Sequence, residues 1–313
     1  MSKSRWFTLL VAVTVLALLP GMAIGKPRSG SFKQVGHEPL MNRGMNAAIA
    51  IQGRYAYIGS RTDGGHPGMP HGGILVVDIK RPAKPRLVGG PFDAKSGESS
   101  RELRVWKSQK ILIVLNTNCG VGEQLHHCTQ PSISNFRFYD IKGANARNPG
   151  LLRQLNVDTH EFYLWQDPRN RGRALIFAGN AGSTCATRGG SPSCPFAVWD
   201  ISPVRQGKDP VTLFMGGHGY SSGSLHSLTI SNDGTRAYFA LLTGGFAIVD
   251  VSDFAAGRPN PQPHPITPDT ARPAWPGPIA RSSSGTGTGR GSPTRCTGPQ
   301  QDPATAVRGA GPA

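Results

Sequence analysis

One short pattern recurs four times along the chain, each time as an apolar run that ends in an aspartate. The four aspartates are Asp78, Asp140, Asp200 and Asp250, which lie 50 to 62 residues apart, and an apolar residue follows each one. Self-similarity at such a period is typical of repeat architectures, in which each copy is one structural unit that stacks on the next. The chain is therefore expected to fold as a series of similar units.

Each copy contains enough strand signals for four strands. The aspartate-ended run is preceded by two β-rich runs, and a proline-containing turn after it leads into a fourth apolar piece. The first run of each copy lies at residues 46–51, 101–106, 160–165 and 225–230. Turn sequences such as Asn232-Asp233-Gly234 separate the first run from the second. This order predicts an all-β fold, a β-propeller with four-stranded antiparallel blades, of which about four are visible.

Two of the copies carry a recognisable family pattern. Residues 73–88 read GILVVDIKRPAKPRLV and residues 245–253 read GFAIVDVSD. These segments resemble the LVIVD-type repeats of secreted bacterial propeller proteins, whereas the two middle copies match more loosely. The resemblance covers roughly residues 46–268 and implies a propeller. It implies little about activity, because propellers host many unrelated functions.

The first 25 residues have the layout of a secretory signal peptide. Lys3 and Arg5 precede an apolar stretch at residues 6–19, and small residues at Ala23 and Gly25 suit cleavage after Gly25. A retained anchor is the alternative, but the apolar stretch is shorter than the roughly 20 residues that span a bilayer. We therefore expect a secreted or extracytoplasmic protein with no stable membrane span after signal cleavage.

The chain changes character after the last repeat. Residues 26–268 are assigned to the LVIVD-like repeats, and residues 269–313 form a tail rich in Pro, Gly, Ser and Arg that is expected to be disordered. Propellers usually need more than four blades to close. One hypothesis is therefore that the propeller is incomplete, with the tail replacing further blades through truncation or a change of reading frame; the alternative is a native flexible tail.

The cysteine spacing favours disulfides in an oxidising compartment. Cys119 and Cys128 are nine positions apart, as are Cys185 and Cys194, and each pair encloses a loop-like stretch. Two local disulfides, Cys119–Cys128 and Cys185–Cys194, are expected. A zinc site is a weaker interpretation because the spacing lacks paired two-residue knuckles.

The net charge of +16 raises the question of an anionic partner. The basic residues are scattered over loops and turns, and no basic helix or basic-aromatic pattern occurs. A nucleic-acid interface is therefore disfavoured. A protein, a glycan or a small molecule is the expected partner.

The first strand of each blade lines the central channel of a propeller, so its polar side chains can converge. Those strands carry two sets of polar residues. The first set is metal-capable and consists of Glu102, His160, Glu161 and His226. The second set consists of the other channel-lining residues, Asn46, Arg101 and Arg104. The first set could ligate a divalent metal. The alternative is that these side chains form hydrogen bonds and ion pairs between blades. Alternation along a strand argues that His160 and Glu161 face opposite ways.

The repeated aspartates are expected to cap the turn after each third strand. Two functions remain open: a noncatalytic binding or scaffold propeller, which we favour, and a metal-dependent oxidase or hydrolase that works at the channel. No feature of the sequence identifies the ligand or the substrate.

Overall fold

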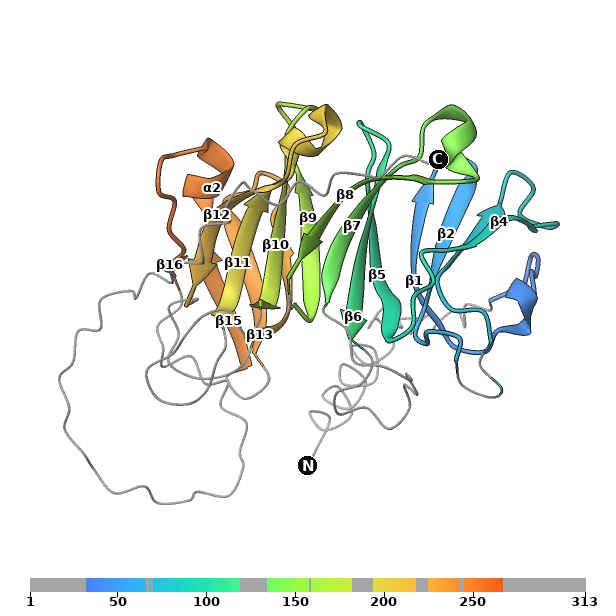
Figure 1. Ribbon diagram of the computed structural model, residues 1–313. Helices are drawn as coiled ribbons and strands as arrows, with labels where there is room; N and C mark the ends of the chain where they lie inside the picture. Colours follow the sequence, from blue (N-terminus) through green and yellow to red (C-terminus); the bar gives the residue numbers. More distant parts are fainter. Residues whose placement is uncertain are drawn as a thin grey trace, which may run out of the picture. The chain divides into compact units, whose positions relative to one another are not determined.

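The computed structural model describes residues 32–65, 68, 70–118, 134–157, 159–181, 194–217, 225–241 and 245–266. The chain divides into two compact units, Met1–Val35 and Gly36–Ala313. In the first unit only residues 32–35 are described, and they have no regular secondary structure. The second unit contains four four-stranded sheets, each built from consecutive antiparallel strands (Figure 1). The predicted all-β fold and its four-stranded repeat are confirmed.

The strand bounds follow the repeat closely. The first sheet contains β1 (Asn46–Gln52), β2 (Tyr55–Ser60), β3 (Ile74–Asp78) and β4 (Arg86–Phe92), and the second contains β5 (Glu98–Trp106), β6 (Ile111–Asn118), β7 (Asn135–Asp140) and β8 (Gly150–Asn156). The third contains β9 (Glu161–Gln166), β10 (Ala174–Ala181), β11 (Cys194–Asp200) and β12 (Val211–Gly216), and the fourth contains β13 (Leu225–Ile230), β14 (Arg236–Leu241), β15 (Gly245–Asp250) and β16 (His264–Pro265).

Helical turns are short and lie mostly between the strands. Three are 3₁₀ turns, at Leu40–Asn42, Gly143–Ala146 and Ser202–Gln206, and one is a single α-helical turn, α2 (Ser252–Ala256). Within the described residues no helix is long and apolar enough to cross a membrane.

Three hydrophobic cores hold consecutive sheets together. The first core joins Tyr57 and Ile74 of the first sheet to Leu112 of the second. The second core joins the second sheet to the third, and the last core joins the third sheet to the fourth. Middle strands such as β6 and β10 are apolar on consecutive residues because each of their faces packs on a different neighbouring sheet. A single sheet would leave both faces uncovered.

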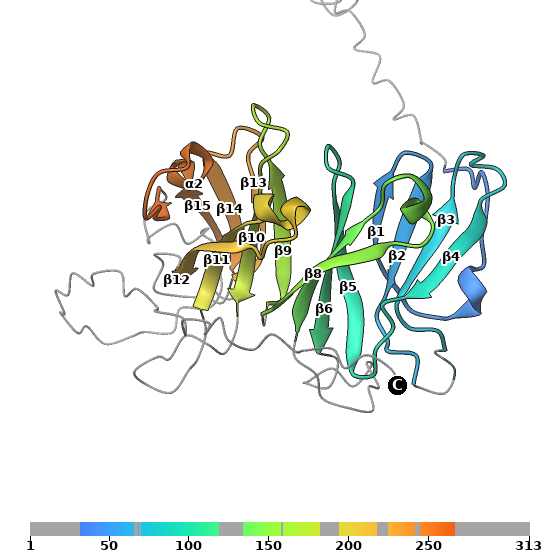
Figure 2. The same cartoon turned by 45° about the horizontal axis from the view of Figure 1, so that its top comes forward.

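The first strands of the sheets are neighbours in chain order. β1 contacts β5, β5 contacts β9, and β9 contacts β13. Figure 2 shows the order of the sheets, from β1–β4 in blue and cyan to β13–β15 in orange. Among the described residues, no hydrophobic core joins the first sheet to the fourth. We call β1, β5, β9 and β13 the inner strands.

Three of the four repeated aspartates bind the backbone at the end of the third strand, as expected for turn capping. Asp78, Asp200 and Asp250 each accept a hydrogen bond from the backbone N–H two residues later, at 2.8–2.9 Å. Asp140 differs, since it accepts from Asn145 at 2.7 Å and from Arg205 at 2.8 Å. Hydrogen bonds from the Arg54 side chain and from the Lys80 backbone hold the pKa of Asp78 at about 2.

Arg43 is a fully buried cation that the sequence analysis did not single out. Its guanidinium donates hydrogen bonds to four backbone carbonyls, of Gly73 at 2.7 Å, Ile58 at 2.9 Å, Gly59 at 2.5 Å and His71 at 3.5 Å. Its Nε donates to Asn46 Oδ1 at 2.9 Å. Burial lowers the pKa of Arg43 to about 10. Asn46 therefore helps to hold this arginine at the start of β1.

Arg137 is the second buried cation, and it lies in the middle of the second sheet. It forms ion pairs with Asp93 and with Glu98, the latter at 2.6 Å. Asn135 donates to Glu98 at 3.0 Å and Asn116 donates to Asp93 at 2.9 Å. Burial opposes the charge of Arg137, but the two carboxylates outweigh it and raise its pKa. The network is a structural one, because buried charges are tolerated only when paired and hydrogen-bonded.

Candidate functional site

Three metal-capable side chains converge where β9 and β13 begin. His160 precedes β9 directly, Glu161 is its first residue, and His226 is the second residue of β13. One possible ligand atom from each residue lies within 4.8 Å of the others. The centroids of the two imidazole rings are 4.9 Å apart. We call these three residues the His–Glu–His cluster.

The expectation that His160 and Glu161 face opposite ways is wrong for their ligand atoms. It assumed that both residues belong to one regular strand, but β9 begins at Glu161 and His160 lies in a bend. The His160 N–H donates to the Gly179 carbonyl at 3.2 Å, and Thr159 Oγ1 donates to the same oxygen at 2.7 Å. Strand alternation therefore does not apply at this position.

Irregular pairing also marks the other two inner strands around the cluster. The β5–β6 register shifts between Ser100 and Glu102, and the β13–β14 register shifts between Leu225 and Ser227. Arg101 and His226 are thus the extra residues of two bulges. A bulge bends its strand and changes the direction of a side chain. No signal in the sequence marks either bulge.

Three charged residues of β5, Arg101, Glu102 and Arg104, contact the cluster or each other. Arg101 Nη2 lies 3.3 Å from His160 Nε2. Because a guanidinium only donates hydrogen bonds, this Nε2 is the acceptor, which places the proton of a neutral His160 on Nδ1. Arg104 pairs with Glu102 at 2.9 Å. Glu102 is not one of the three residues whose ligand atoms converge.

The electrostatic surroundings of Glu161 combine both signs of charge. Its burial and the nearby Glu102 carboxylate raise its pKa, and His226, Arg101 and Arg104 partly offset this. A cation placed between Glu161 and the imidazoles would favour the ionised carboxylate. The cluster therefore offers two imidazole nitrogens and one carboxylate, a ligand set that suits zinc, copper, iron or nickel.

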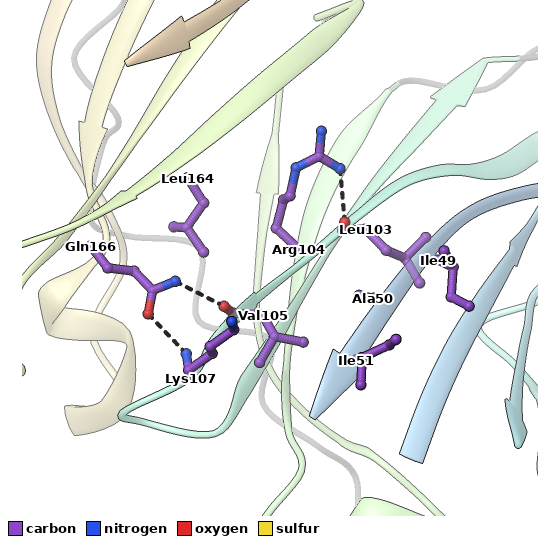
Figure 3. Close-up of a pocket in the computed structure, with 9 residues that line it drawn as sticks. All are labelled: Ile49, Ala50, Ile51, Leu103, Arg104, Val105, Lys107, Leu164 and Gln166. Atoms are coloured by element: carbon purple, nitrogen blue, oxygen red, sulfur yellow. Dashed lines mark hydrogen bonds between the residues drawn. The ribbon is translucent and has the colours of Figure 1, made fainter. Parts of the chain in front are cut away.

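A shallow hollow lies on the inner strands, over β5 and between β1 and β9 (Figure 3). We call it the inner-strand hollow; its volume is about 440 Å³ and it is lined by Ile49, Ala50, Ile51, Leu103, Arg104, Val105, Lys107, Leu164 and Gln166. Gln166 joins its two sides, since its Nε2 donates to the Val105 carbonyl at 3.1 Å and its Oε1 accepts from the Lys107 N–H at 3.0 Å. The Gln166 side-chain amide therefore links β9 to β5, as a pair of backbone hydrogen bonds would link two strands of one sheet.

Several predicted features lie outside the described residues. They are the signal peptide at residues 1–25, the tail at residues 269–313, and the cysteines Cys119, Cys128 and Cys185. Cys194 begins β11, but its side chain is not described. The two expected disulfides remain predictions.

Comparison with known proteins points to one repeat family. The LVIVD repeat matches residues 43–90 and 226–256, which cover the strands of the first copy and most of the fourth. No curated protein matches the chain in sequence.

Solved structures with detectable similarity are distant. A 6-phosphogluconolactonase candidate from Bacteroides fragilis is 12% identical over 75% of this chain and 58% of its own, with a TM-score of 0.46. AztD from Citrobacter koseri is 14% identical over 67% and 44%, with a TM-score of 0.35. The periplasmic gluconolactonase PpgL from Pseudomonas aeruginosa is 9% identical over 69% and 67%, with a TM-score of 0.35. The chain spans about half the length of the first two. Two segments of the chain therefore match the LVIVD repeat, and its four four-stranded antiparallel sheets have the architecture of β-propeller blades.

Proposed function

We propose that this protein is an extracytoplasmic binding propeller that holds a divalent transition-metal ion at the His–Glu–His cluster. The convergence of ligand atoms from His160, Glu161 and His226 within 4.8 Å carries the proposal. Metal–nitrogen and metal–oxygen bonds of about 2.0–2.2 Å set adjacent ligand atoms roughly 3–3.5 Å apart. A bound ion would therefore require the three ligand atoms to move closer together than the 4.8 Å within which they now lie.

Imidazole nitrogens determine which metal is expected. Two histidines and one carboxylate favour Zn²⁺, Cu²⁺ or Ni²⁺ over Ca²⁺ and Mg²⁺, which prefer all-oxygen sites. The protein supplies three ligands, so a water or a ligand group completes the coordination. Export is supported by the signal-peptide layout of residues 1–25.

The ion pair between Glu102 and Arg104 favours a binding role over a metal-dependent oxidase or hydrolase. A hydrolase of this kind needs a carboxylate that can accept a proton from metal-bound water. Glu102 lies near enough to Glu161 to raise the pKa of that residue, but the Glu102 carboxylate is already paired with Arg104 at 2.9 Å.

Calorimetric titration of the chelator-treated chain with Zn²⁺ tests the proposal. We expect one ion per chain, and a loss of affinity of more than about 10-fold in His160→Ala and in His226→Ala. His264→Ala is the matched control, because His264 is an exposed histidine on β16 outside the cluster. Unchanged far-ultraviolet circular dichroism would establish that the variants fold. The absence of binding, or equal binding by His226→Ala and the parent chain, would contradict the proposal.

A further inference from the structure

Arg101 lies against the atom of the His–Glu–His cluster that a metal ion would use. Its Nη2 is 3.3 Å from His160 Nε2, and because the guanidinium is the donor, the lone pair of Nε2 is directed toward it. A metal–nitrogen bond at this atom is about 2.0–2.1 Å long. An ion at Nε2 therefore displaces Nη2 from the lone pair and leaves the guanidinium beside the coordination sphere.

The backbone of β5 supports this placement. Arg101 is the extra residue of the β5 bulge, since the pairing with β6 shifts between Ser100 and Glu102. Bulges redirect side chains and are common next to functional sites. The other arginine of β5, Arg104, is held by the Glu102 carboxylate at 2.9 Å and the Leu103 carbonyl at 2.9 Å, and it lies over the Phe162 ring. Arg101 is therefore the guanidinium of β5 that contacts the cluster.

The charges around the cluster favour an anion at the open position of the metal. The groups that act on Glu161 include two guanidiniums and one carboxylate, those of Arg101, Arg104 and Glu102. Together with a divalent ion and the ionised Glu161, they carry two more positive than negative formal charges. Water in the open position leaves that excess in place, whereas an anion reduces it. Charges at a half-buried site are screened less than charges at the surface.

The geometry of the two cationic groups selects the kind of anion. The site offers two contact points, the open position of the ion and the Arg101 guanidinium. A carboxylate has two oxygens in one plane, and such planar groups are the acceptors that a guanidinium matches best. The three residues of the cluster are half-buried, so the site is accessible to a small molecule.

We propose that the His–Glu–His cluster, once it holds a divalent metal ion, binds a small organic carboxylate, with one oxygen on the ion and the other at Arg101. This inference rests on the metal site proposed above. It gives the binding propeller a ligand class, small organic acids, and it makes Arg101 a ligand-binding residue.

Acetate, acetamide and sulfate are the probes, titrated by calorimetry into the full chain with and without one equivalent of Zn²⁺. Acetamide has the size of acetate without its charge and is expected to bind the Zn²⁺-loaded chain at least about 10-fold more weakly. Acetate is expected to bind the metal-free chain at least about 10-fold more weakly than the loaded chain. Sulfate is tetrahedral and has more oxygens than two contact points can bind, so it should bind more weakly than acetate.

Variants of Arg101 locate the carboxylate. Arg101→Gln is expected to weaken acetate binding at least about fivefold without weakening Zn²⁺ binding, so the two affinities separate. Arg101→Lys keeps the charge without the planar fork and should lose less than Arg101→Gln. Arg153→Gln is the matched control, because Arg153 is 40% exposed on the outer strand β8. One equivalent of bound Zn²⁺ shows that each variant is folded.

The outcomes distinguish this inference from the proposed function. Zn²⁺ binding combined with equal affinities for acetate and acetamide would overturn the carboxylate site and leave the metal site intact. Acetate binding that is unchanged in Arg101→Gln, or sulfate binding tighter than acetate binding, would overturn it as well. A chain that binds no Zn²⁺ would contradict the proposed function and this inference together.

Discussion

Two phenylalanines at the same repeat position provide a direct test of how the sheets are stabilised. Phe136 is the second residue of β7 and Phe246 is the second residue of β15. Phe136 is fully buried, whereas Phe246 is 55% exposed. In each copy this residue faces the next sheet along the chain. For Phe136 that sheet is the third, and for Phe246 no further sheet is present among the described residues.

The contacts of the two side chains set the expected magnitudes. Phe136 lies edge-on to Phe162 at 5.0 Å and to Trp199 at 5.9 Å, both from the third sheet. Removing such a ring leaves a cavity, and Phe136→Ala is expected to destabilise the protein by about 3–5 kcal/mol. Phe246 stacks on Tyr238 at 6.1 Å with its outer face in water. Its loss leaves no cavity, so Phe246→Ala should cost about 1 kcal/mol or less.

Urea unfolding of the parent chain and the two variants, followed by tryptophan fluorescence, measures the difference. Phe136→Leu serves as a milder variant if Phe136→Ala does not accumulate, with an expected cost of about 1–1.5 kcal/mol. The slope of the transition should stay constant, since the surface exposed on unfolding is similar. Equal destabilisation by Phe246→Ala and Phe136→Ala would refute the reasoning, because it would mean that the outer face of the fourth sheet is covered in solution.

Three further predictions follow from charged residues. Arg43→Met should cost about 3–5 kcal/mol in urea unfolding, because it removes the donor that binds four backbone carbonyls. The Asp78 carboxyl should titrate near pH 2 in ¹³C NMR, and in Arg54→Gln its pKa should return toward the ordinary value of about 3.9. Because the pKa of Asp78 is depressed in the folded state, the ionised carboxylate stabilises the protein above pH 4, and this stabilisation is lost as the pH falls toward 2. A titration unchanged by Arg54→Gln would contradict this assignment. Arg101→Gln should tighten Zn²⁺ binding several-fold in calorimetry, because the guanidinium competes with the ion for His160 Nε2; weaker binding would show instead that Arg101 orients the imidazole.

The repeat pattern was sufficient to predict the four sheets and the positions of most strands. Strand signals are local, so alternation, turn residues and the period of the copies reveal them without knowledge of the tertiary contacts. The same pattern led to the inner strands as the place where His160, Glu161 and His226 would lie. It placed the start of β9 one residue too early, at His160, and the start of β5 three residues too late, at Arg101.

What only the tertiary structure decided is where individual side chains point and what covers them. The bulges at Arg101 and His226 depend on hydrogen-bond register with a neighbouring strand, which no local pattern encodes. Arg43 looks like a surface residue in the sequence and is buried because four distant carbonyls converge on it. Phe246 looks like a core residue and is exposed, because the burial of a sheet face is set by the neighbouring sheet and not by the strand itself.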